Sequence, residues 1–152
     1  MTICPLADLP QAIPLLATWV HNEWCSFDGR SIGMIETQLA ENLGRDSVPI
    51  TFLAMQESRV IGTVSLDLSD LPSHDHLSPW LASLFVPPEA RSQGKGIVLV
   101  RHAQEFAKSH QIGPLYLWTP GSTRIYEGCG WTEIERTIYG SHPITIMRVD
   151  VA

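Results

Sequence analysis

The sequence predicts a mixed α/β fold, and three observations support this class. Segments with the apolar spacing of helices stand among short segments rich in strand-forming residues. A strand, a loop containing glycines, a helix and a second strand follow one another between residues 80 and 119. The chain has 152 residues, of which 44% are hydrophobic, so it is long enough to bury one core.

The first half of the chain is predicted to contain two helices and a β-hairpin. Residues 8–24 carry apolar side chains at helical spacing, with an aspartate in the N-cap position and a proline in the first turn. Pro14 lies inside this pattern, so a helix that begins near Pro14 is the alternative. A second helix over 31–44 begins at a capping serine and stops at a glycine. Strands at 50–55 and 60–68 form the hairpin, and alternation in the second strand predicts one apolar and one polar face.

The second half is predicted to alternate between strands and helices after a polar loop at 69–79. A double proline ends the strand that follows this loop. The elements expected are a buried strand at 80–86, a helix at 94–110, a strand at 115–119, a brief helix at 122–127 and two closing strands at 131–138 and 143–151.

Charge and hydropathy exclude several classes of function. The net charge of −6 disfavours nucleic acid as a partner, because phosphate binding needs a basic face, whereas it suits a cationic substrate. No apolar stretch approaches the roughly 18 residues that span a membrane. The N-terminal residues lack the basic start and apolar run of a signal peptide. We therefore expect a cytoplasmic protein that is not bound to a membrane.

The sequence does not predict a metal site or a disulfide framework. Cys4, Cys25 and Cys129 are odd in number and widely separated, so we interpret them as reduced thiols. His74 and His76 have the alternating spacing that offers two imidazoles to a metal, but no third ligand is evident near them.

A loop in the middle of the chain has the features of an anion-binding site. After the strand at 80–86 the chain turns, and Gly94 and Gly96 open a helix. Glycines allow backbone to approach a ligand closely, and free N–H groups at a helix N-terminus favour negative charge. Arg91 and Lys95 add positive charge nearby. The spacing fits neither a dinucleotide fingerprint nor a P-loop, and a plain structural turn is the alternative interpretation.

Two motifs together resemble the GNAT superfamily of acetyltransferases. Arg91-x-x-Gly94-x-Gly96, after a strand that ends in Val86-Pro87, resembles the acyl-CoA loop of that family. The second motif is Tyr126-Glu-x-x-Gly130-Trp131, which follows a strand and a short helix as it does in the family. The pair is far more specific than either half, and the resemblance covers residues 80–131.

The resemblance implies a fold and an activity. The expected fold is one GNAT-type domain over residues 1–152, with a mixed, mostly antiparallel sheet of six or seven strands flanked by about four helices. The implied activity is that of an N-acetyltransferase that uses acetyl-CoA as co-substrate and no metal. A primary amine, on a small molecule or at a peptide N-terminus, would attack directly in a ternary complex. Because dimers are common in the family, a homodimer is also compatible with the resemblance.

The family pattern assigns residues to acetyl-CoA. The main chain of Phe85 and Val86 would pair with the pantetheine arm, and Leu84 would lie beside the acetyl carbonyl. A hydroxyl of Thr119, where members often carry Asn, or of Ser122 would contact the same arm. Backbone N–H groups of the loop would hold the pyrophosphate; the loop residues are Arg91, Ser92, Gln93, Gly94, Lys95 and Gly96.

Tyr126 is the predicted general acid. A phenol with a reference pKa of about 10 can protonate a departing thiolate of reference pKa about 8.5 when the two are held in contact. The general base is left open, because residues 81–83 offer no carboxylate where many members carry Glu. Its candidates are Glu23, Asp28 and Asp67, and an amine that enters in its neutral form would need no base.

Acceptor contacts are predicted from elements that border the acceptor cleft in the family. The residues are Glu23, Trp24, Phe27, Asp67 and Tyr139. Two other functions stay open at this point. One is a non-catalytic sensor that binds acyl-CoA on the same fold. The other is a binding module in which the glycine loop is structural.

Overall fold

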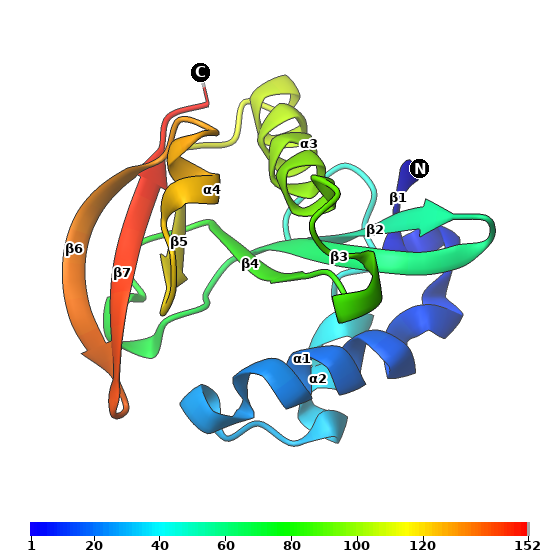
Figure 1. Ribbon diagram of the computed structural model, residues 1–152, viewed down its shortest axis with the longest axis horizontal. Helices are drawn as coiled ribbons and strands as arrows, with labels where there is room; N and C mark the ends of the chain where they lie inside the picture. Colours follow the sequence, from blue (N-terminus) through cyan, green and yellow to red (C-terminus); the bar gives the residue numbers. More distant parts are fainter. Residues whose placement is uncertain (152) are drawn as a thin grey trace.

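Seven strands form a single sheet in the computed structural model, which describes residues 1–151 (Figure 1). The strand order is β1-β2-β3-β4-β5-β7-β6, and all neighbours are antiparallel except the parallel pair β4–β5. The strands are β1 Thr2–Pro5, β2 Ile50–Gln56, β3 Arg59–Asp67, β4 Trp80–Phe85, β5 Leu115–Thr119, β6 Thr132–Tyr139 and β7 His142–Val149. The predicted mixed, mostly antiparallel sheet is confirmed.

Four α-helices cover the two faces of this sheet. They are α1 Ile13–Asp28, α2 Ile32–Ala40, α3 Lys95–Ser109 and α4 Arg124–Glu127. Helices α1 and α2 pack together on one face, while α3 crosses the other (Figure 1). Strand β2 serves both layers: Phe52 belongs to the cluster under α3, and Leu53 belongs to the cluster under α1 and α2.

The boundaries of the first two helices differ from the expected ones. Helix α1 starts at Ile13, which agrees with the alternative start near Pro14 and not with one at Asp8, because two short 3₁₀ turns precede it and Pro14 falls in its first turn. It continues to Asp28, where Gly29 adopts φ +67° and its N–H caps the Cys25 carbonyl. Helix α2 ends at Ala40, before the predicted glycine, because the chain turns there and buries the side chain of Asn42.

Strand β1 and the burial of the polar side of β3 were not anticipated. Strand β1 has only four residues and no alternation, and its pairing with β2 defines it. The polar face predicted for β3 is buried, since Thr63 is 2% exposed and Ser65 is 1% exposed. The Thr63 hydroxyl donates to the Phe52 carbonyl, and that of Ser65 shares a 2.7 Å hydrogen bond with Thr51. These bonds offset the cost of burying polar groups under α1 and α2.

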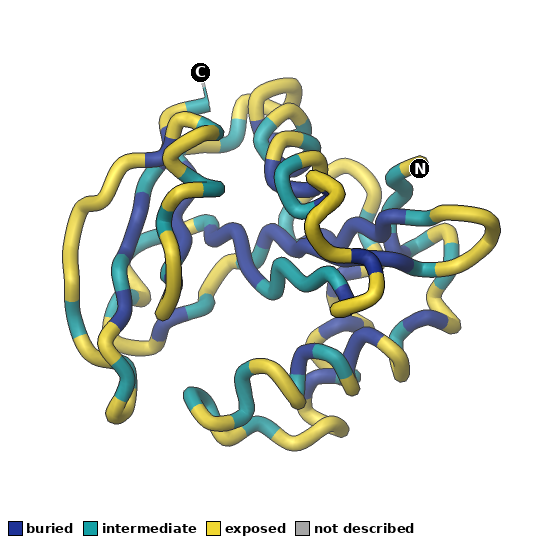
Figure 2. The backbone as a smooth tube through the Cα atoms, in the orientation of Figure 1, coloured by how far each residue is buried: buried dark blue, intermediate teal, exposed yellow. Residues whose placement is uncertain are grey.

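Burial is concentrated in the central strands and on the inner sides of α1 and α3 (Figure 2). Strand β6 forms one edge of the sheet and is largely exposed. Among residues 1–151, no helix combines the length and the apolar character needed to cross a bilayer.

Gly62 on β3 leaves room for a side chain of α3 and for the main chain at the end of β4. A Cβ atom added to Gly62 would stand 2.9 Å from Leu99 Cδ1 and 3.3 Å from the Phe85 carbonyl oxygen.

We therefore expect Gly62→Ala to lower the free energy of unfolding by about 1–3 kcal/mol through overpacking, measured by urea denaturation. The control is Gly33→Ala on α2, where the nearest atom lies 3.9 Å away and no loss is expected. Equal stability of Gly62→Ala and the parent protein would show that this contact relaxes freely.

Candidate active site

The parallel strands β4 and β5 separate soon after they meet. Their single paired position is Trp80 with Tyr116, and the Tyr116 N–H donates to the Pro79 carbonyl (3.1 Å). On its other edge β4 carries a bulge: Ala82 pairs with Ser65 and Phe85 pairs with Thr63, so Ser83 and Leu84 together face one residue of β3. Ser83 takes φ +55° within this bulge. An extra residue in a bulge stays outside the ladder, so main-chain groups become available at this point.

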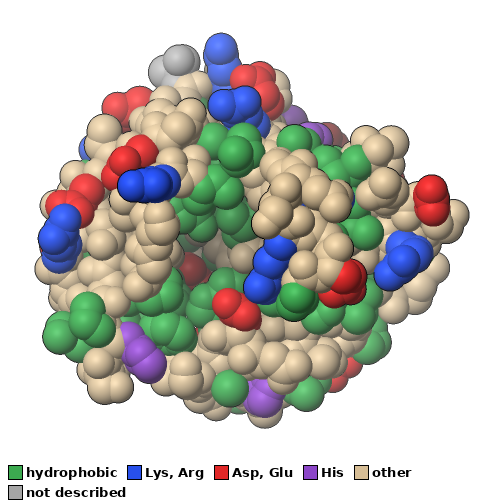
Figure 3. Space-filling view, viewed as in Figure 1, with side chains coloured by type: hydrophobic (Ala, Val, Ile, Leu, Met, Phe, Trp, Pro, Cys, Tyr) green, Lys and Arg blue, Asp and Glu red, His purple; other side chains and the backbone are tan. Residues whose placement is uncertain are grey.

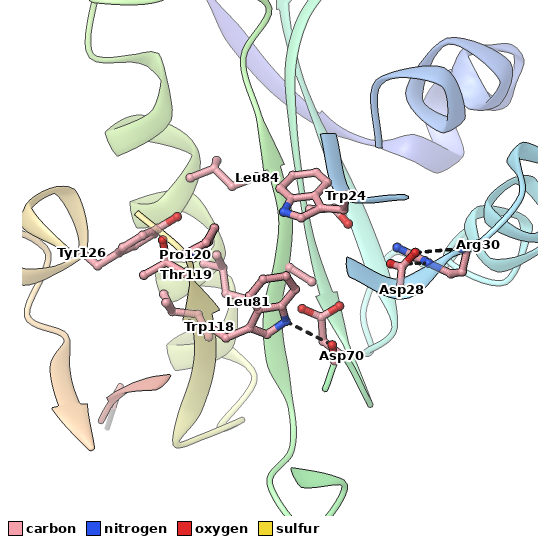
Figure 4. A pocket seen from close by; sticks show the side chains of 13 residues that line it. Trp24, Asp28, Arg30, Asp70, Leu81, Leu84, Trp118, Thr119, Pro120 and Tyr126 are labelled. Carbon is pink, nitrogen blue, oxygen red and sulfur yellow. Dashed lines mark hydrogen bonds and ion pairs between the residues drawn. The ribbon is translucent and has the colours of Figure 1, made fainter. Parts of the chain in front are cut away.

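A cavity of about 70 Å³ lies where the two strands part, and we name it the splay cavity (Figure 4). Strands β4 and β5 supply two walls, α1 and its following turn supply a third, and α4 supplies Tyr126. The lining residues are Trp24, Asp28, Arg30, Asp70, Leu81–Leu84, Leu117–Pro120 and Tyr126.

Tyr126 is held in this wall by the second sequence motif. The N–H of Trp131 donates to the Tyr126 carbonyl (3.1 Å), and the two rings meet edge to face with centroids 6.4 Å apart. The Trp131 indole is buried and donates to Gln104 Oε1 (2.8 Å), while Gln104 Nε2 donates to the Cys129 carbonyl (3.0 Å). The motif thus attaches the one-turn helix α4 to α3.

The ionisation of Tyr126 is suppressed by its surroundings. Burial, with a smaller contribution from the neighbouring Cys129, raises the pKa of Tyr126 to about 12. The phenol therefore keeps its proton throughout the physiological pH range and can act as a donor.

A second cavity, of about 360 Å³, lies beside the glycine loop, and we name it the loop cavity. Its lining residues are Glu23, Leu84–Val86, Ala90–Ser92, Gly94–Ile97 and Ile125. Ser92 and Gly94 adopt φ +65° and +75°, which turns the chain sharply into α3. The first bond of that helix runs from the Val98 N–H to the Gly94 carbonyl (3.1 Å), so the amides of residues 95–97 have no acceptor inside the helix. Such a terminus favours an anion.

The two basic side chains of the loop have structural partners. Arg91 Nε donates to the Val86 carbonyl (2.7 Å), and the guanidinium lies over the Phe85 ring at 5.6 Å. Lys95 is 8% exposed and donates to the Ala90 carbonyl (3.3 Å) and to the side chain of Gln93. Arg91 therefore brings a charge to the surface of the loop, whereas Lys95 fastens the loop from within.

The two predicted hydroxyl contacts stand at the end of β5. Thr119 Oγ1 accepts the Gly121 N–H, and Ser122 Oγ accepts the Arg124 N–H, each at 3.2 Å. A hydroxyl that accepts one bond still has its own proton to donate. Of the two residues, Thr119 lines the splay cavity.

A third cavity, of about 210 Å³, lies between α2 and the end of β3, and we name it the acidic cavity. Its lining residues are Val20, Arg30, Ile35, Gln38, Leu39, Glu41, Asn42, Pro49, Ser65, Asp67–Asp70 and Ser83. Asp67 Oδ1 accepts a 2.8 Å hydrogen bond from Asn42, which is 6% exposed and also donates to Thr51 (3.1 Å). The cavity shares Arg30, Asp70 and Ser83 with the splay cavity.

The carboxyl groups in this region differ in their electrostatic state. Burial raises the pKa of Asp67 to about 6, against the opposing effects of the Asn42 hydrogen bond and the Arg30 charge. Burial and the charge of Asp67 raise the pKa of Asp70 well above its ordinary value, with Arg30 acting in the opposite direction. Asp28 is paired with Arg30 at 2.8 Å, and the Arg30 N–H also donates to it (2.9 Å). A cation bound beside Asp67 and Asp70 would favour their ionised forms, so binding would change the charge of these two groups.

On the face viewed in Figure 3 the molecule is hollowed near its centre. Hydrophobic side chains form much of the wall of this hollow, and acidic side chains lie within and beside it (Figure 3). The open face thus combines apolar walls with negative charge.

The sequence model described as the acetyltransferase (GNAT) family matches residues 16–131. The protein belongs to the GNAT acetyltransferase family. A search of curated proteins gave no match for the sequence of this acetyltransferase.

Solved structures of other GNAT acetyltransferases share the fold at low sequence identity. The aminoglycoside 6'-N-acetyltransferase from Enterococcus faecium is 14% identical, with a TM-score of 0.72 over 100% of this chain and 98% of that one. Spermidine N-acetyltransferase from Vibrio cholerae, in complex with CoA and spermine, is 18% identical, with a TM-score of 0.72 over 97% and 94%. Ribosomal-protein-alanine N-acetyltransferase from Brucella melitensis is 20% identical, with a TM-score of 0.71 over 97% and 98%.

The structure of this acetyltransferase divides the predicted acceptor residues among three cavities and one aromatic cluster. Trp24 lines the splay cavity, Asp67 lines the acidic cavity and Glu23 lines the loop cavity. Phe27 and Tyr139 pack against Trp118, with their ring centroids 5.2 Å from the indole. This aromatic cluster holds the end of α1 against β5 and the last hairpin.

Two residues that line these cavities escaped sequence reasoning. Arg30 lies two residues after Asp28, which was predicted as a candidate base, and a basic residue so close to a candidate base was a usable signal. Asp70 belongs to the polar loop at 69–79, and no pattern in that loop distinguishes it. It reaches the cavity because the Trp118 indole donates to its main-chain carbonyl (3.1 Å; Figure 4).

The histidines considered as metal ligands lie in the loop before β4. Within 1–151, no three His, Cys, Asp or Glu side chains gather closely enough to ligate an ion. The rings of His74 and His76 stack at 5.6 Å, and His74 Nε2 contacts Glu135 Oε1 at 3.1 Å.

The raised pKa of Asp67, about 6, makes stability depend on pH. Because the unfolded value is about 3.9, the native state holds this proton more tightly, and the free energy of unfolding falls as pH rises from about 4 to 6. We expect Asp67→Asn to reduce that fall and to be more stable than the parent at pH 7 by about 1–3 kcal/mol. Urea denaturation across this pH range measures both effects.

The control for this measurement is Asp46→Asn, because the side chain of Asp46 is 92% exposed. We expect this variant to keep the pH dependence of the parent. A slope in Asp67→Asn as steep as that of the parent would assign the titration to another group.

Proposed function

We propose that this acetyltransferase transfers the acetyl group of acetyl-CoA to a primary amine by direct attack in a ternary complex. The observation that carries the proposal is the position of Leu84, which lines both the splay cavity and the loop cavity. A donor that enters along the loop and an acceptor that enters through the splay cavity would therefore meet at Leu84, beside Tyr126.

The residues present fit the chemical parts of acetyl-CoA. The free amides of residues 95–97 at the start of α3 would bind the pyrophosphate, as helix N-termini bind anions. The edge of β4 that faces β5 would receive the pantetheine arm as an added strand. An arm bound at Val86 would displace Arg91 from the Val86 carbonyl, and the released guanidinium would be available to a phosphate. The complex of the Vibrio cholerae neighbour with CoA supports this donor.

Main-chain amides of the Ser83–Leu84 bulge would stabilise negative charge that develops on the thioester oxygen. A preorganised donor of this kind contributes roughly 3–4 kcal/mol to a transition state. Tyr126 would protonate the departing sulfur from the opposite wall. Its raised pKa of about 12 keeps it protonated, and burial in the same gap raises the proton affinity of the thiolate as well.

The acceptor amine must lose a proton before or during attack. Among the carboxyl groups, Asp28 is paired with Arg30, whereas Asp70 lines the splay cavity. The raised pKa of Asp70 brings its basicity closer to that of an amine, which favours it over an exposed carboxylate as the base. Cys129 packs against the core behind Tyr126, which supports direct attack rather than an acetylated cysteine.

Binding of the donor is tested by thermal unfolding with and without acetyl-CoA. At about 100 times the Kd the stabilisation should be about 2.7 kcal/mol, or roughly 5–10 °C for a chain of this size. We expect Gly94→Trp to abolish the shift, because the Cβ position of Gly94 is open and a large side chain there would cover the loop. Gly94→Asn, which tolerates positive φ, is the matched control and should keep the shift.

Catalysis by Tyr126 is tested by comparing Tyr126→Phe with Tyr116→Phe. Loss of a general acid should lower kcat by about 10²–10⁴-fold, while the thermal shift caused by acetyl-CoA stays the same. Tyr116→Phe removes a hydroxyl from β5 and should keep kcat. A kcat in Tyr126→Phe within twofold of the parent would exclude Tyr126 as the acid.

The two tests together decide between the functions considered. An acetyl-CoA shift without turnover of any amine would indicate an acyl-CoA sensor. The lack of any shift in the folded protein would leave the glycine loop with a structural role alone.

A further inference from the structure

The splay cavity and the acidic cavity meet at Asp70. Both are lined by Arg30, Asp70 and Ser83. A ligand at the Ser83–Leu84 bulge would therefore have Asp70 beside it and Asp67 in the adjoining cavity. The splay cavity, at about 70 Å³, is the smaller of the two, and the acidic cavity has about 210 Å³. The small volume favours an unbranched aminoalkyl arm at the reacting end.

The charges around this path are only partly balanced within the protein. Arg30 is bound to Asp28 through Nε and its main-chain N–H, and its terminal nitrogen donates to Gln38. The Asp28–Arg30 pair is therefore neutral. Asp67 and Asp70 remain without a cationic side chain in direct contact among residues 1–151.

Asp70 is the carboxyl group that the two cavities share. It is partly buried, and the surrounding protein raises the pKa of its carboxyl group, although the Trp118 side chain acts in the opposite direction. The Trp118 indole donates to the main-chain carbonyl of Asp70 (3.1 Å). A partly desolvated carboxylate that no cation contacts gains from further donors, so this arrangement provides a place for a ligand that carries N–H donors.

Asp67 offers a second position of the same kind. Asn42 donates to its Oδ1 atom and is itself fixed by Thr51, so the carboxyl group is held in a defined orientation. Its other oxygen, Oδ2, accepts no hydrogen bond found in the described chain. Glu41 lines the same cavity and is exposed at the surface, which adds negative charge there.

We propose that the acceptor is an unbranched aliphatic diamine or a longer polyamine, with its reacting nitrogen beside Asp70 in the splay cavity and its second ammonium on Asp67 in the acidic cavity. This inference rests on the acetyl transfer proposed above. It assigns the two carboxyl groups different tasks: Asp70 receives the amine that reacts, and Asp67 selects for a second cation.

The test uses three probes that differ only at the far end: pentylamine, 1,5-diaminopentane and 5-aminopentanoate. Each is titrated calorimetrically into the full-length protein, with and without CoA. We expect 1,5-diaminopentane to bind at least tenfold more tightly than pentylamine, because a charge-assisted hydrogen bond contributes about that factor or more. 5-Aminopentanoate should bind most weakly, since its carboxylate would face Asp67.

Two variants test whether Asp67 is the group that selects a second cation. Asp67→Asn should lower the preference for the diamine over pentylamine at least fivefold, whereas Asp46→Asn, which removes an exposed charge, should retain it. The comparison of probes on the parent protein needs no variant, so it stands even if Asp67→Asn folds poorly. Equal affinities for pentylamine and the diamine, tighter binding of 5-aminopentanoate, or equal losses in both variants would overturn the proposal.

Turnover of the same probes separates this inference from the proposed function. Acetylation of pentylamine and the diamine with equal kcat/KM and equal affinity would retain the transferase and overturn the diamine site. Tight and selective diamine binding without acetylation of any probe would support the diamine site and refute the proposed transfer.

Discussion

The parting of β4 and β5 is the constraint on which the site depends. Two parallel strands that share one paired position expose backbone groups along both edges, and a protein interior tolerates this only where something else can occupy the gap. The rings of Trp80 and Tyr116 pack with their centroids 5.9 Å apart at the end where the two strands pair. The strands therefore part in one direction only, away from this pair. The β4 bulge turns further main-chain groups toward the same space.

The polar layer under the sheet explains how carboxyl groups come to lie beside this opening. Thr51, Ser65, Asn42 and Asp67 form one hydrogen-bonded chain beneath α2. An apolar layer would pack the same space at less electrostatic cost, since each buried carboxyl group loses water. The Asp67 carboxyl group therefore lowers the stability of the folded protein, and its place close to the bulge is explained by the binding of a ligand there.

The local elements and the glycine loop were readable from the chain because each depends on neighbours in sequence. The helix opened by Gly94 and Gly96, the strand ended by Pro87-Pro88 and the brief helix that carries Tyr126 were all placed to within a few residues. Local signals failed where tertiary contacts set the boundary. Strand β1 exists through its pairing with β2, and α2 stops early so that Asn42 can reach Asp67.

The sequence by itself determined the mixed α/β class and the glycine loop, because turn chemistry and periodicity act over short distances. The place of Tyr126 in a motif came from the resemblance to the GNAT family. The tertiary structure alone decided that Lys95 points inward, that Phe27 and Tyr139 support Trp118, and that Asp70 lies between two cavities. Asp70 is far in sequence from Leu84 and Tyr126. The pKa of its carboxyl group is raised by burial and by the nearby charge of Asp67. Burial and charge proximity arise from long-range packing, which no pattern within a single loop can reveal.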